Sequence, residues 1–565
     1  MDEFVFIISA LGRFVKNLTA VFTKNPHPAG NIYSYFTNPP GRYDKIGTGS
    51  DANLRAAADM KRRFYMSFKI AFIGAGSVGF TRRLLSDLLT VPEFHDIEVS
   101  FMDINPRNLD MVYRLCQRDI DENGLNIRIK PTLDRREAFR DAKYVINAVR
   151  IGMLEAFEKD IEVALRYGVD QCVGDTLAAG GIMYGQRGIP QILDFCRDIR
   201  EVAAPGCLLL SYSNPCAMMT WAANKYGGVP TVGLCHGVQG GHWQIADALG
   251  YKQNEVDITA AGLNHQTWYI KVSHNGEDLT DRILPAYEAN EWLSKTEKVR
   301  IDMLKHFGYY STESNGHLSE YVAWYRKNPE EINKWLDHAG GWSNGETGGY
   351  LRVCREGRNW FETDFPNWLA APANRFVPEQ RSQEHGSYII EALETGRVYR
   401  GHFNVMNNGT ITNLPAECVV EVPGYVDKNG IGIPKVGDLP LGCAAVCSQS
   451  AWVQRLAVEA AVAGDRQLLV QAMMMDPLTG ALLTTPEIDQ MVDEYLIEEA
   501  EWLPQYAGEI EGAKARMEER RANGTFIAKH RGDTGAAKVH EKTVAEMQAE
   551  ADERRKLAAK TDKTH

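Results

Sequence analysis

The chain has 565 residues, of which 44% are hydrophobic, and its 62 Lys and Arg against 74 Asp and Glu give a formal net charge of −12 at pH 7. This length and composition predict a protein of two or more domains, or one elaborated α/β unit with additions, and exclude a mainly disordered chain. The acidic balance argues against a nucleic-acid binder, and ten cysteines without a Cys-x-x-Cys pair exclude a disulfide scaffold and favour a reducing compartment.

Residues 1–65 show no convincing pattern of secondary structure. Their start, Asp2-Glu3 before a short apolar run at 4–8, lacks the basic residues and longer apolar core of a secretory signal. No segment is long and apolar enough to span a bilayer. We therefore expect a cytoplasmic protein whose fold begins near Met66. Residues 1–65 are then an extension outside the fold or, alternatively, a flexible arm.

Residues 66–255 alternate strands and helices, the pattern of a doubly wound parallel sheet of the Rossmann type. The expected strands are 68–73, 98–103, 144–149, 207–212 and 231–234. Residues 74–79 read Gly-Ala-Gly-Ser-Val-Gly between the first strand and a helical segment at 80–89. Glycines at this spacing allow a tight turn that brings the backbone and a helix N-terminus close to a pyrophosphate. The expected cofactor contacts are Gly74, Ala75, Gly76, Ser77 and Gly79.

Two polar residues at strand ends extend this nucleotide site. Asp103 ends the second strand, where a carboxylate can accept a hydrogen bond from a ribose hydroxyl, which favours NAD over NADP. Asn147 follows the strand residues 144–146 and is placed to line the nicotinamide side. Both residues are candidate cofactor contacts.

Residues 256–508 predict an α+β domain. Strands are expected at 256–262 and 266–272, with a turn at His274-Asn275-Gly276 and helices at about 282–305, 378–394 and 449–475. From 509 to 565 the chain is charged and Ala-rich. This tail is expected to be a solvated helix or a disordered segment, and no function is assigned to it.

Three short segments place polar groups at strand ends, where open α/β sheets bind their ligands. They are Ser213-Asn214-Pro215, Gly-Leu-Cys-His-Gly at 233–237 and Gly-Leu-Asn-His at 262–265. Taken singly, each has a plain structural interpretation: a small core cysteine, a hydrogen-bonded histidine, or a turn before proline.

Together with the nucleotide motif, these segments resemble glycoside hydrolase family 4, the NAD- and manganese-dependent glycosidases. The resemblance covers about residues 66–506 and is strongest toward the melibiase-type α-galactosidases. Further matching segments are Asp175-Thr176-Leu177, Thr312-Glu313-Ser314, Glu320-Tyr321 and Asn413-Leu414-Pro415. The resemblance implies a fold like that of lactate and malate dehydrogenases, the cofactors NAD and Mn²⁺, and a homo-oligomer, either a dimer or a tetramer.

The family reaction explains why a hydrolase would carry a dinucleotide. In that scheme NAD⁺ accepts a hydride from sugar C3, and the resulting ketone acidifies the proton on C2. A base removes this proton while the metal stabilises the enediolate. The group on C1 leaves by elimination, water adds, and the hydride returns, so no net oxidation occurs.

The resemblance also implies roles for individual residues: the metal ligands are Cys235 and His265, and the substrate contacts are Asp175 and Asn214. Tyr321 is the candidate C2 base, although a free phenol has a pKa near 10 and would need a nearby cation. His236 is a candidate general acid, since it stands where the phospho-glycosidase branch has Asp. Ala178-Ala179 replaces the family's commoner Gly-Pro, which puts the loop shape in doubt, and Glu313 and His317 have no assigned role.

Several functions remain open from the sequence. The leading hypothesis is an α-galactosidase acting on unphosphorylated galactosides such as melibiose. The close alternative is another α-glycosidase of the same family, an α-glucosidase or an α-galacturonidase. A different class is an NAD-dependent 2-hydroxy acid dehydrogenase, against which the Cys235–His265 pair argues, and a further one is an NAD-binding regulatory protein.

Overall fold

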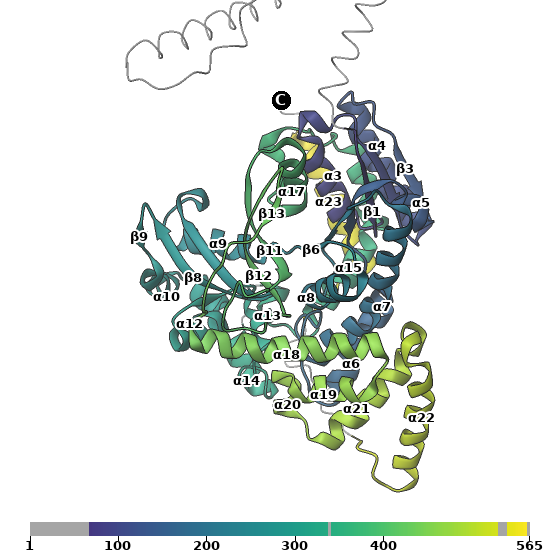
Figure 1. Cartoon of the computed structure of the whole chain (residues 1–565), viewed down its shortest axis with the longest axis vertical. Coiled ribbons are helices and arrows are strands. Elements are labelled where there is room, and N and C mark those ends of the chain that lie inside the picture. Colours follow the sequence, from purple (N-terminus) through teal and green to yellow (C-terminus); the bar gives the residue numbers. More distant parts are fainter. Residues whose placement is uncertain (1–66, 337–340, 529–538, 562–565) are drawn as a thin grey trace, which may run out of the picture. The chain divides into compact units, whose positions relative to one another are not determined.

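The computed structural model describes residues 67–336, 341–528 and 539–561, which all belong to one compact unit (Figure 1). The expected N-terminal extension, residues 1–65, lies outside the described residues. A single mixed sheet of 13 strands forms the centre of the unit. No helix in the described ranges has both the length and the hydrophobicity needed to cross a membrane.

Six parallel strands form one half of the sheet. In spatial order they are β3 (Ile129–Thr132), β2 (Glu98–Met102), β1 (Lys69–Ile73), β4 (Ala142–Asn147), β5 (Leu208–Ser211) and β6 (Thr231–Gly233). The order 3-2-1-4-5-6 is that of a Rossmann fold, which confirms the predicted fold class. Strand β3 is not among the expected strands, and its Pro131 is tolerated because the strand lies at the sheet edge.

Helices cover both faces of this half, so successive side chains of β1 enter two different cores. Ile70 and Phe72 pack with residues of α3 (Val78–Leu89) and α4 (Pro106–Glu122). Ala71 and Ile73 pack with residues of α6 (Met153–Arg166) and α7 (Ala178–Val202). The strands are therefore hydrophobic on both sides, as their sequences predict.

Antiparallel strands extend the same sheet beyond β6. They follow in the order β11 (Tyr399–Met406), β12 (Val419–Asp427), β7 (Asp257–Leu263), β8 (Gln266–His274) and β10 (Tyr310–Ser311). The expected strands 256–262 and 266–272 are β7 and β8, and the expected turn joins β8 to β9 (Glu277–Asp278). Because β11 and β12 lie between β6 and β7, the proposed division at residue 255 runs through one continuous sheet.

The helical predictions for residues 256–508 are correct in type but wrong in length. The helix expected at 449–475 is two helices, α18 (Leu441–Ala463) and α19 (Arg466–Met475). Gly464 ends α18 with φ +66°, and the Asp465 side chain accepts hydrogen bonds from the N–H groups of Gln467 and Leu468, the second and third residues of α19. The segment 282–305 likewise forms three helices, α10 (Ile283–Ala289), α11 (Leu293–Thr296) and α12 (Lys298–Phe307), and 378–394 forms α17 (His385–Thr395).

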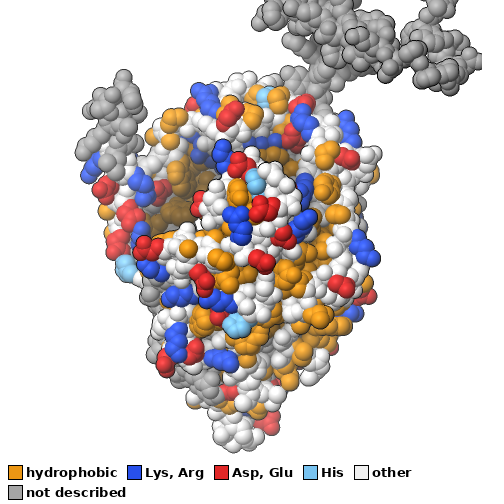
Figure 2. Space-filling view, turned by 90° about the vertical axis from the view of Figure 1, so that its left-hand side faces the viewer, with side chains coloured by type: hydrophobic (Ala, Val, Ile, Leu, Met, Phe, Trp, Pro, Cys, Tyr) orange, Lys and Arg blue, Asp and Glu red, His pale blue; other side chains and the backbone are white. Residues whose placement is uncertain are grey.

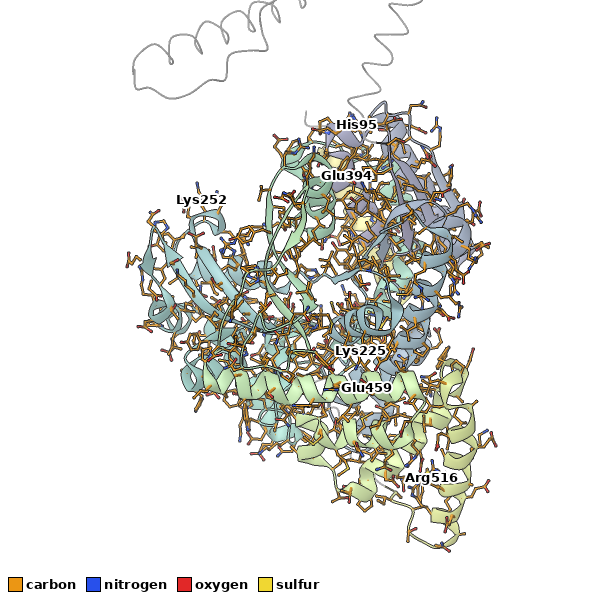
Figure 3. The ribbon with its side chains drawn as sticks, in the orientation of Figure 1. His95, Lys225, Lys252, Glu394, Glu459 and Arg516 are labelled. Atoms are coloured by element: carbon orange, nitrogen blue, oxygen red, sulfur yellow. The ribbon has the colours of Figure 1, made fainter. Side chains whose placement is uncertain are left out.

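The long helix α18 lies across the end of the molecule that carries α19, α20 (Pro477–Leu482) and α21 (Thr485–Glu498) (Figure 1). Lys225, in the helical turn that follows α8 (Cys216–Ala222), donates a 2.8 Å hydrogen bond to Glu459 of α18 (Figure 3). Helix α18 therefore packs against α8 and the turn that follows it.

The described part of the expected tail is helical. In α22 (Ala507–Ala522), Ile510, Ala513 and Met517 are buried, and the helix packs against α21. In α23 (Val544–Thr561), Met547 and Ala551 are buried, and the helix packs against α15 (Gly349–Thr363). Both helices therefore contribute to the folded unit through apolar contacts.

Candidate active site

The register of the sheet places one row of residues side by side at the carboxyl ends of the parallel strands. From β4 to β7 the row is Asn147, Ser211, Gly233, Asn404, Glu421 and Gly262. The turns that follow Gly233 and Gly262 carry Cys235 and His265. The sheet thus brings together segments that are far apart in the sequence, at the edge where such folds bind ligands.

The predicted nucleotide site is formed by the turn after β1. Gly74 has φ +80°, and a Cβ there would lie 2.8 Å from the Ala148 carbonyl oxygen. Gly76 N–H donates a 2.8 Å hydrogen bond to Asp103 Oδ2, so the carboxylate is held beside the turn. Asn147 is fully buried and donates to Ser211 Oγ at 3.2 Å. The turn leads into α3, whose N-terminus suits a pyrophosphate.

The loop before α7 is held by a buried carboxylate from a distant helix. Glu320, in α13 (Asn315–Glu320), accepts backbone hydrogen bonds from Cys172, Val173 and Gly174 at 2.6, 3.0 and 2.9 Å. Burial raises the pKa of Glu320 to about 7, although these hydrogen bonds oppose the rise. Glu320 therefore positions the neighbouring Asp175.

Asp175 and Asn214, the predicted substrate residues, are in contact. Asn214 Nδ2 donates to Asp175 Oδ2 at 2.7 Å, and Thr176 Oγ1 donates to Asp175 Oδ1 at 2.8 Å. Thr176 Oγ1 also lies 2.8 Å from His265 Nδ1. Because Thr176 donates its single hydroxyl proton to Asp175, it accepts from His265 Nδ1–H. With its proton on Nδ1, a neutral imidazole offers the Nε2 lone pair to a cation.

His265 lies in the two-residue turn between β7 and β8, with φ +62°. Its Nε2 is 4.0 Å from Glu313 Oε1, and Glu313 Oε1 is 3.3 Å from Cys235 Sγ. Cys235, His265 and Glu313 each offer one donor atom, and these atoms lie within 4.8 Å of one another. Asp175, His265 and His317 form a second such group. The predicted metal ligands Cys235 and His265 are thus placed together.

The electrostatics of this cluster combine burial with close opposite charges. Burial, followed by the negative charge of Glu313, raises the pKa of the Cys235 thiol well above its usual value. Burial also favours the neutral form of Glu313, but His265, His317, His236 and a hydrogen bond from Cys235 together lower its pKa to about 2. Burial lowers the pKa of His317 to about 4, so this imidazole is neutral at pH 7.

Thiolate, imidazole and carboxylate donors at this spacing fit a divalent cation. The fit of these residues to a cation is supported by contacts as well as by the sequence motif. Thr176 accepts from Nδ1 of His265, and Glu313 lies beside Cys235. A cation bound there would also compensate the buried charge of Glu313.

The two predicted catalytic residues occupy different depths. Tyr321 is fully buried, its ring stacks near His265 at 6.5 Å between centroids, and its hydroxyl lies beside the Thr176 side chain. Burial raises the pKa of Tyr321 well above its usual value, and Asp175 and Glu320 add to this effect. The His236 side chain is 63% exposed, with Nδ1 3.6 Å from Glu384 Oε1. His236 therefore lies at the rim and Tyr321 in the interior.

Two further buried polar residues, Glu421 of β12 and Asn404 of β11, lie beside the site and were not expected from the sequence. Glu421 Oε2 is 2.9 Å from Thr267 Oγ1, which is itself 2.9 Å from the Leu263 carbonyl oxygen. Burial raises the pKa of Glu421 to about 8. Asn404 is also fully buried. The available signal was a polar residue within each otherwise apolar strand segment, Val-Val-Glu-Val and Phe-Asn-Val-Met.

Comparison with protein families identifies the chain. The model for family 4 glycosyl hydrolases matches residues 69–251, and the model for the family 4 C-terminal domain matches residues 260–479. The chain belongs to glycosyl hydrolase family 4. The first matched region contains Cys235 and the nucleotide turn, and the second contains His265, Glu313 and Tyr321.

Individual family 4 relatives match along most of the chain. An α-galactosidase from Rhizobium meliloti is 53% identical over 494 residues, which cover 87% of this chain and 99% of the relative. An α-galactosidase from Bacillus subtilis is 34% identical over 447 residues, covering 78% and 99% of the two chains.

Solved family 4 structures share the fold. The Bacillus subtilis protein LplD has a TM-score of 0.65 at 25% identity, covering 76% of this chain and all of that chain. A Thermotoga maritima 6-phospho-β-glucosidase, solved with manganese, NAD⁺ and glucose-6-phosphate, has a TM-score of 0.63 at 22% identity, covering 77% and 99%.

Proposed function

We propose that this family 4 glycosyl hydrolase is an α-galactosidase that hydrolyses small α-galactosides and requires NAD⁺ and a divalent cation, Mn²⁺. The proposal rests mainly on one observation. The Cys235–His265 cluster and the nucleotide turn after β1 both lie at the carboxyl ends of the parallel strands. A 2-hydroxy acid dehydrogenase needs no such cluster. The choice of galactoside is supported by the 53% identical α-galactosidase.

The chain's own residues would bind both groups. The turn from Gly74 to Gly79 and the start of α3 would hold the pyrophosphate, and Asp103 would accept a ribose hydroxyl. Cys235 and His265 would hold the cation. When bound, NAD⁺ accepts and returns a hydride and the cation acts as a Lewis acid on sugar oxygens.

Proton transfer falls to Tyr321 and His236 in this proposal. The Tyr321 hydroxyl lies in the site beside Thr176, and in this proposal it takes the proton from sugar C2. Its raised pKa means that the phenol is neutral without a cation nearby, and positive charge next to it would favour the phenolate. His236, exposed at the rim, is placed to protonate the leaving group where the aglycone exits.

Asp175 and Asn214 would bind sugar hydroxyl groups. Asp175 uses one oxygen for Asn214 and the other for Thr176, and each carboxylate oxygen has a second lone pair to accept from a substrate. We further propose that the protein acts in the cytoplasm as a homo-oligomer. All ten cysteines are unpaired, and a thiolate ligand needs a reducing compartment to stay intact.

The decisive experiment supplies the purified chain with Mn²⁺, NAD⁺, a reductant and 4-nitrophenyl α-galactoside, and follows nitrophenol and NADH together. We expect nitrophenol release without net accumulation of NADH, because the hydride is returned within each turnover. Activity should disappear when NAD⁺ or the cation is removed and return when it is restored.

Running the same reaction in D₂O adds an internal control, since proton removal at C2 and its reversal should leave deuterium on C2 of the released galactose. Steady NADH accumulation with the glycosidic bond intact would instead identify a dehydrogenase. Hydrolysis that is independent of both NAD⁺ and cation would also refute the proposal.

A further inference from the structure

Among the described residues, Glu313 is the acidic group that lies close to both implied metal ligands. Its Oε1 is 3.3 Å from Cys235 Sγ and 4.0 Å from His265 Nε2. The side chain is 14% exposed, and among the described residues neither Lys nor Arg forms an ion pair with it. A carboxylate oxygen next to a thiol and an imidazole is a suitable donor to a divalent cation.

We propose that Glu313 is a third protein ligand of the divalent cation, bound through Oε1 beside Cys235 Sγ and His265 Nε2. This inference rests on the metal-dependent function proposed above. Metal bonds of about 2.0–2.3 Å place neighbouring ligand atoms about 3–4 Å apart, as observed for Glu313 and its two neighbours. A thiolate and a carboxylate together also neutralise the two positive charges of the cation.

Gly237 provides the space for this carboxylate. A Cβ at residue 237 would lie 1.5 Å from Glu313 Oε1, and the Gly237 N–H donates a 3.3 Å hydrogen bond to Cys235 Sγ. Any side chain at this position would therefore displace the carboxylate from the thiol. The order Cys235-His236-Gly237 thus supplies a ligand and, two residues later, the room for a second one.

The third ligand changes which metals the site prefers. Thiolate and imidazole alone favour Zn²⁺, whereas carboxylate oxygen suits Mn²⁺ and Mg²⁺. Three protein donors would still leave open coordination positions for substrate oxygens, as metal sites with a facial triad do. Glu313 therefore accounts for a manganese preference that the Cys235–His265 pair does not explain.

The test measures cation binding to the full-length, metal-stripped protein without substrate. Mn²⁺ binding is followed by electron paramagnetic resonance, and Co²⁺ binding by its visible bands and its sulfur-to-cobalt charge-transfer band. Glu313→Gln should weaken Mn²⁺ binding at least about 10-fold, because even loss of an outer partner of a ligand costs 10–100-fold. Zn²⁺ binding should weaken less, and the sulfur-to-cobalt band should persist.

Three further variants separate ligation from a structural effect. Glu313→Asp should recover part of the Mn²⁺ affinity, since it keeps the carboxylate on a shorter side chain. Gly237→Ala should weaken Mn²⁺ binding while every ligand remains present. Cys235→Ser should abolish the sulfur-to-cobalt band. Unchanged NAD⁺ affinity and unfolding temperature of the metal-free proteins would show that each variant is folded.

The inference fails if Glu313→Gln binds Mn²⁺ with the affinity of the unsubstituted protein and keeps the same ratio of Mn²⁺ to Zn²⁺ affinity. Such a result would leave the proposed function intact. Failure of that function would instead be seen in the unsubstituted protein, as galactoside hydrolysis that persists after chelation.

Discussion

At the scale of single residues, Ala178, which stands where the family more often has glycine, has an unusual backbone conformation. It has φ +57°, in the left-handed region that favours glycine, at the first residue of α7. Its N–H is held by Asp476 Oδ2 at 2.9 Å. The family's commoner glycine would adopt the same backbone without strain, whereas an alanine is strained there.

We predict that Ala178→Gly stabilises the protein. The left-handed conformation costs an alanine about 1–2 kcal/mol, whereas the greater freedom of glycine in the unfolded chain costs about 0.4–1 kcal/mol. The net gain should be about 0.5–1 kcal/mol in urea unfolding. The exposed α22 residue Ala515 is the matched control, where Ala515→Gly should destabilise by a similar amount. If both substitutions destabilise the protein, the left-handed backbone at Ala178 is not strained as proposed.

At the scale of elements, β12 supports the hairpin that carries His265. Glu421 of β12 pairs in register with Gly262 of β7, and its carboxyl reaches Thr267 of β8. A protonated Glu421 can donate to Thr267, which then donates to the Leu263 carbonyl at the start of the turn. Thr267 also bonds through its backbone to Thr312, next to Glu313. One carboxyl thus connects the strands that carry two proposed ligands.

This arrangement predicts a pH dependence of stability that Glu421→Gln removes. Folding raises the pKa of Glu421 to about 8 from its usual value near 4.5, so the folded protein retains a proton that the unfolded chain releases. The unfolding free energy should therefore fall between about pH 4.5 and 8. A glutamine, which mimics the protonated acid, should avoid this loss, so the variant gains more than about 1 kcal/mol over the unsubstituted protein between pH 5 and 8.5.

Urea unfolding across this range gives the measurement. Glu519→Gln, at an exposed position of α22, serves as the control and should follow the unsubstituted protein at every pH. If the Glu421→Gln curve also runs parallel to that of the unsubstituted protein, Glu421 is ionised in the folded protein.

Figure 2 shows the side of the molecule near β8 and β9, where a recess with hydrophobic side chains opens at the surface.

For the molecule as a whole, the C-terminal helices close the fold against distant elements. In α23, Arg554 pairs with Asp364 at 2.7 Å, and the Ala551 carbonyl accepts from Asn367 Nδ2 at 3.2 Å. Met547 of α23 is buried, and α23 packs against α15. Helix α15, which α23 covers, also carries Tyr350, whose ring lies 5.2 Å from the Arg150 guanidinium after β4. Helix α15 therefore connects the C-terminal helix α23 to the segment that follows the carboxyl end of β4.

A chain that ends at residue 528 should retain the sheet but loosen α15. Hydrogen exchange should accelerate in residues 349–363 and remain unchanged in β1, β4 and β5, because only α15 and its neighbours lose buried contacts. Met547→Ala should give a weaker version of the same effect, and Glu553→Ala, at an exposed position, should give none. Equal exchange in α15 with and without α23 would show that the helix adds no stability.

The sequence by itself determined the parts of this protein that depend on local order. The Gly-rich turn after an apolar strand, Asp103 one strand later and the alternation of strands and helices are read along the chain, because each involves neighbouring residues or one repeating unit. Cys235 and His265 were also named from the sequence, through their resemblance to family motifs.

Only the tertiary structure decided which residues remote in sequence are neighbours in space. Strands β11 and β12 enter the sheet between β6 and β7, which no local pattern specifies, and this insertion brings Asn404 and Glu421 behind the site. Glu313 had no role until the fold placed it 3.3 Å from Cys235. The physical reason is that burial, pairing of charges and the competition for a proton depend on distances between residues remote in sequence.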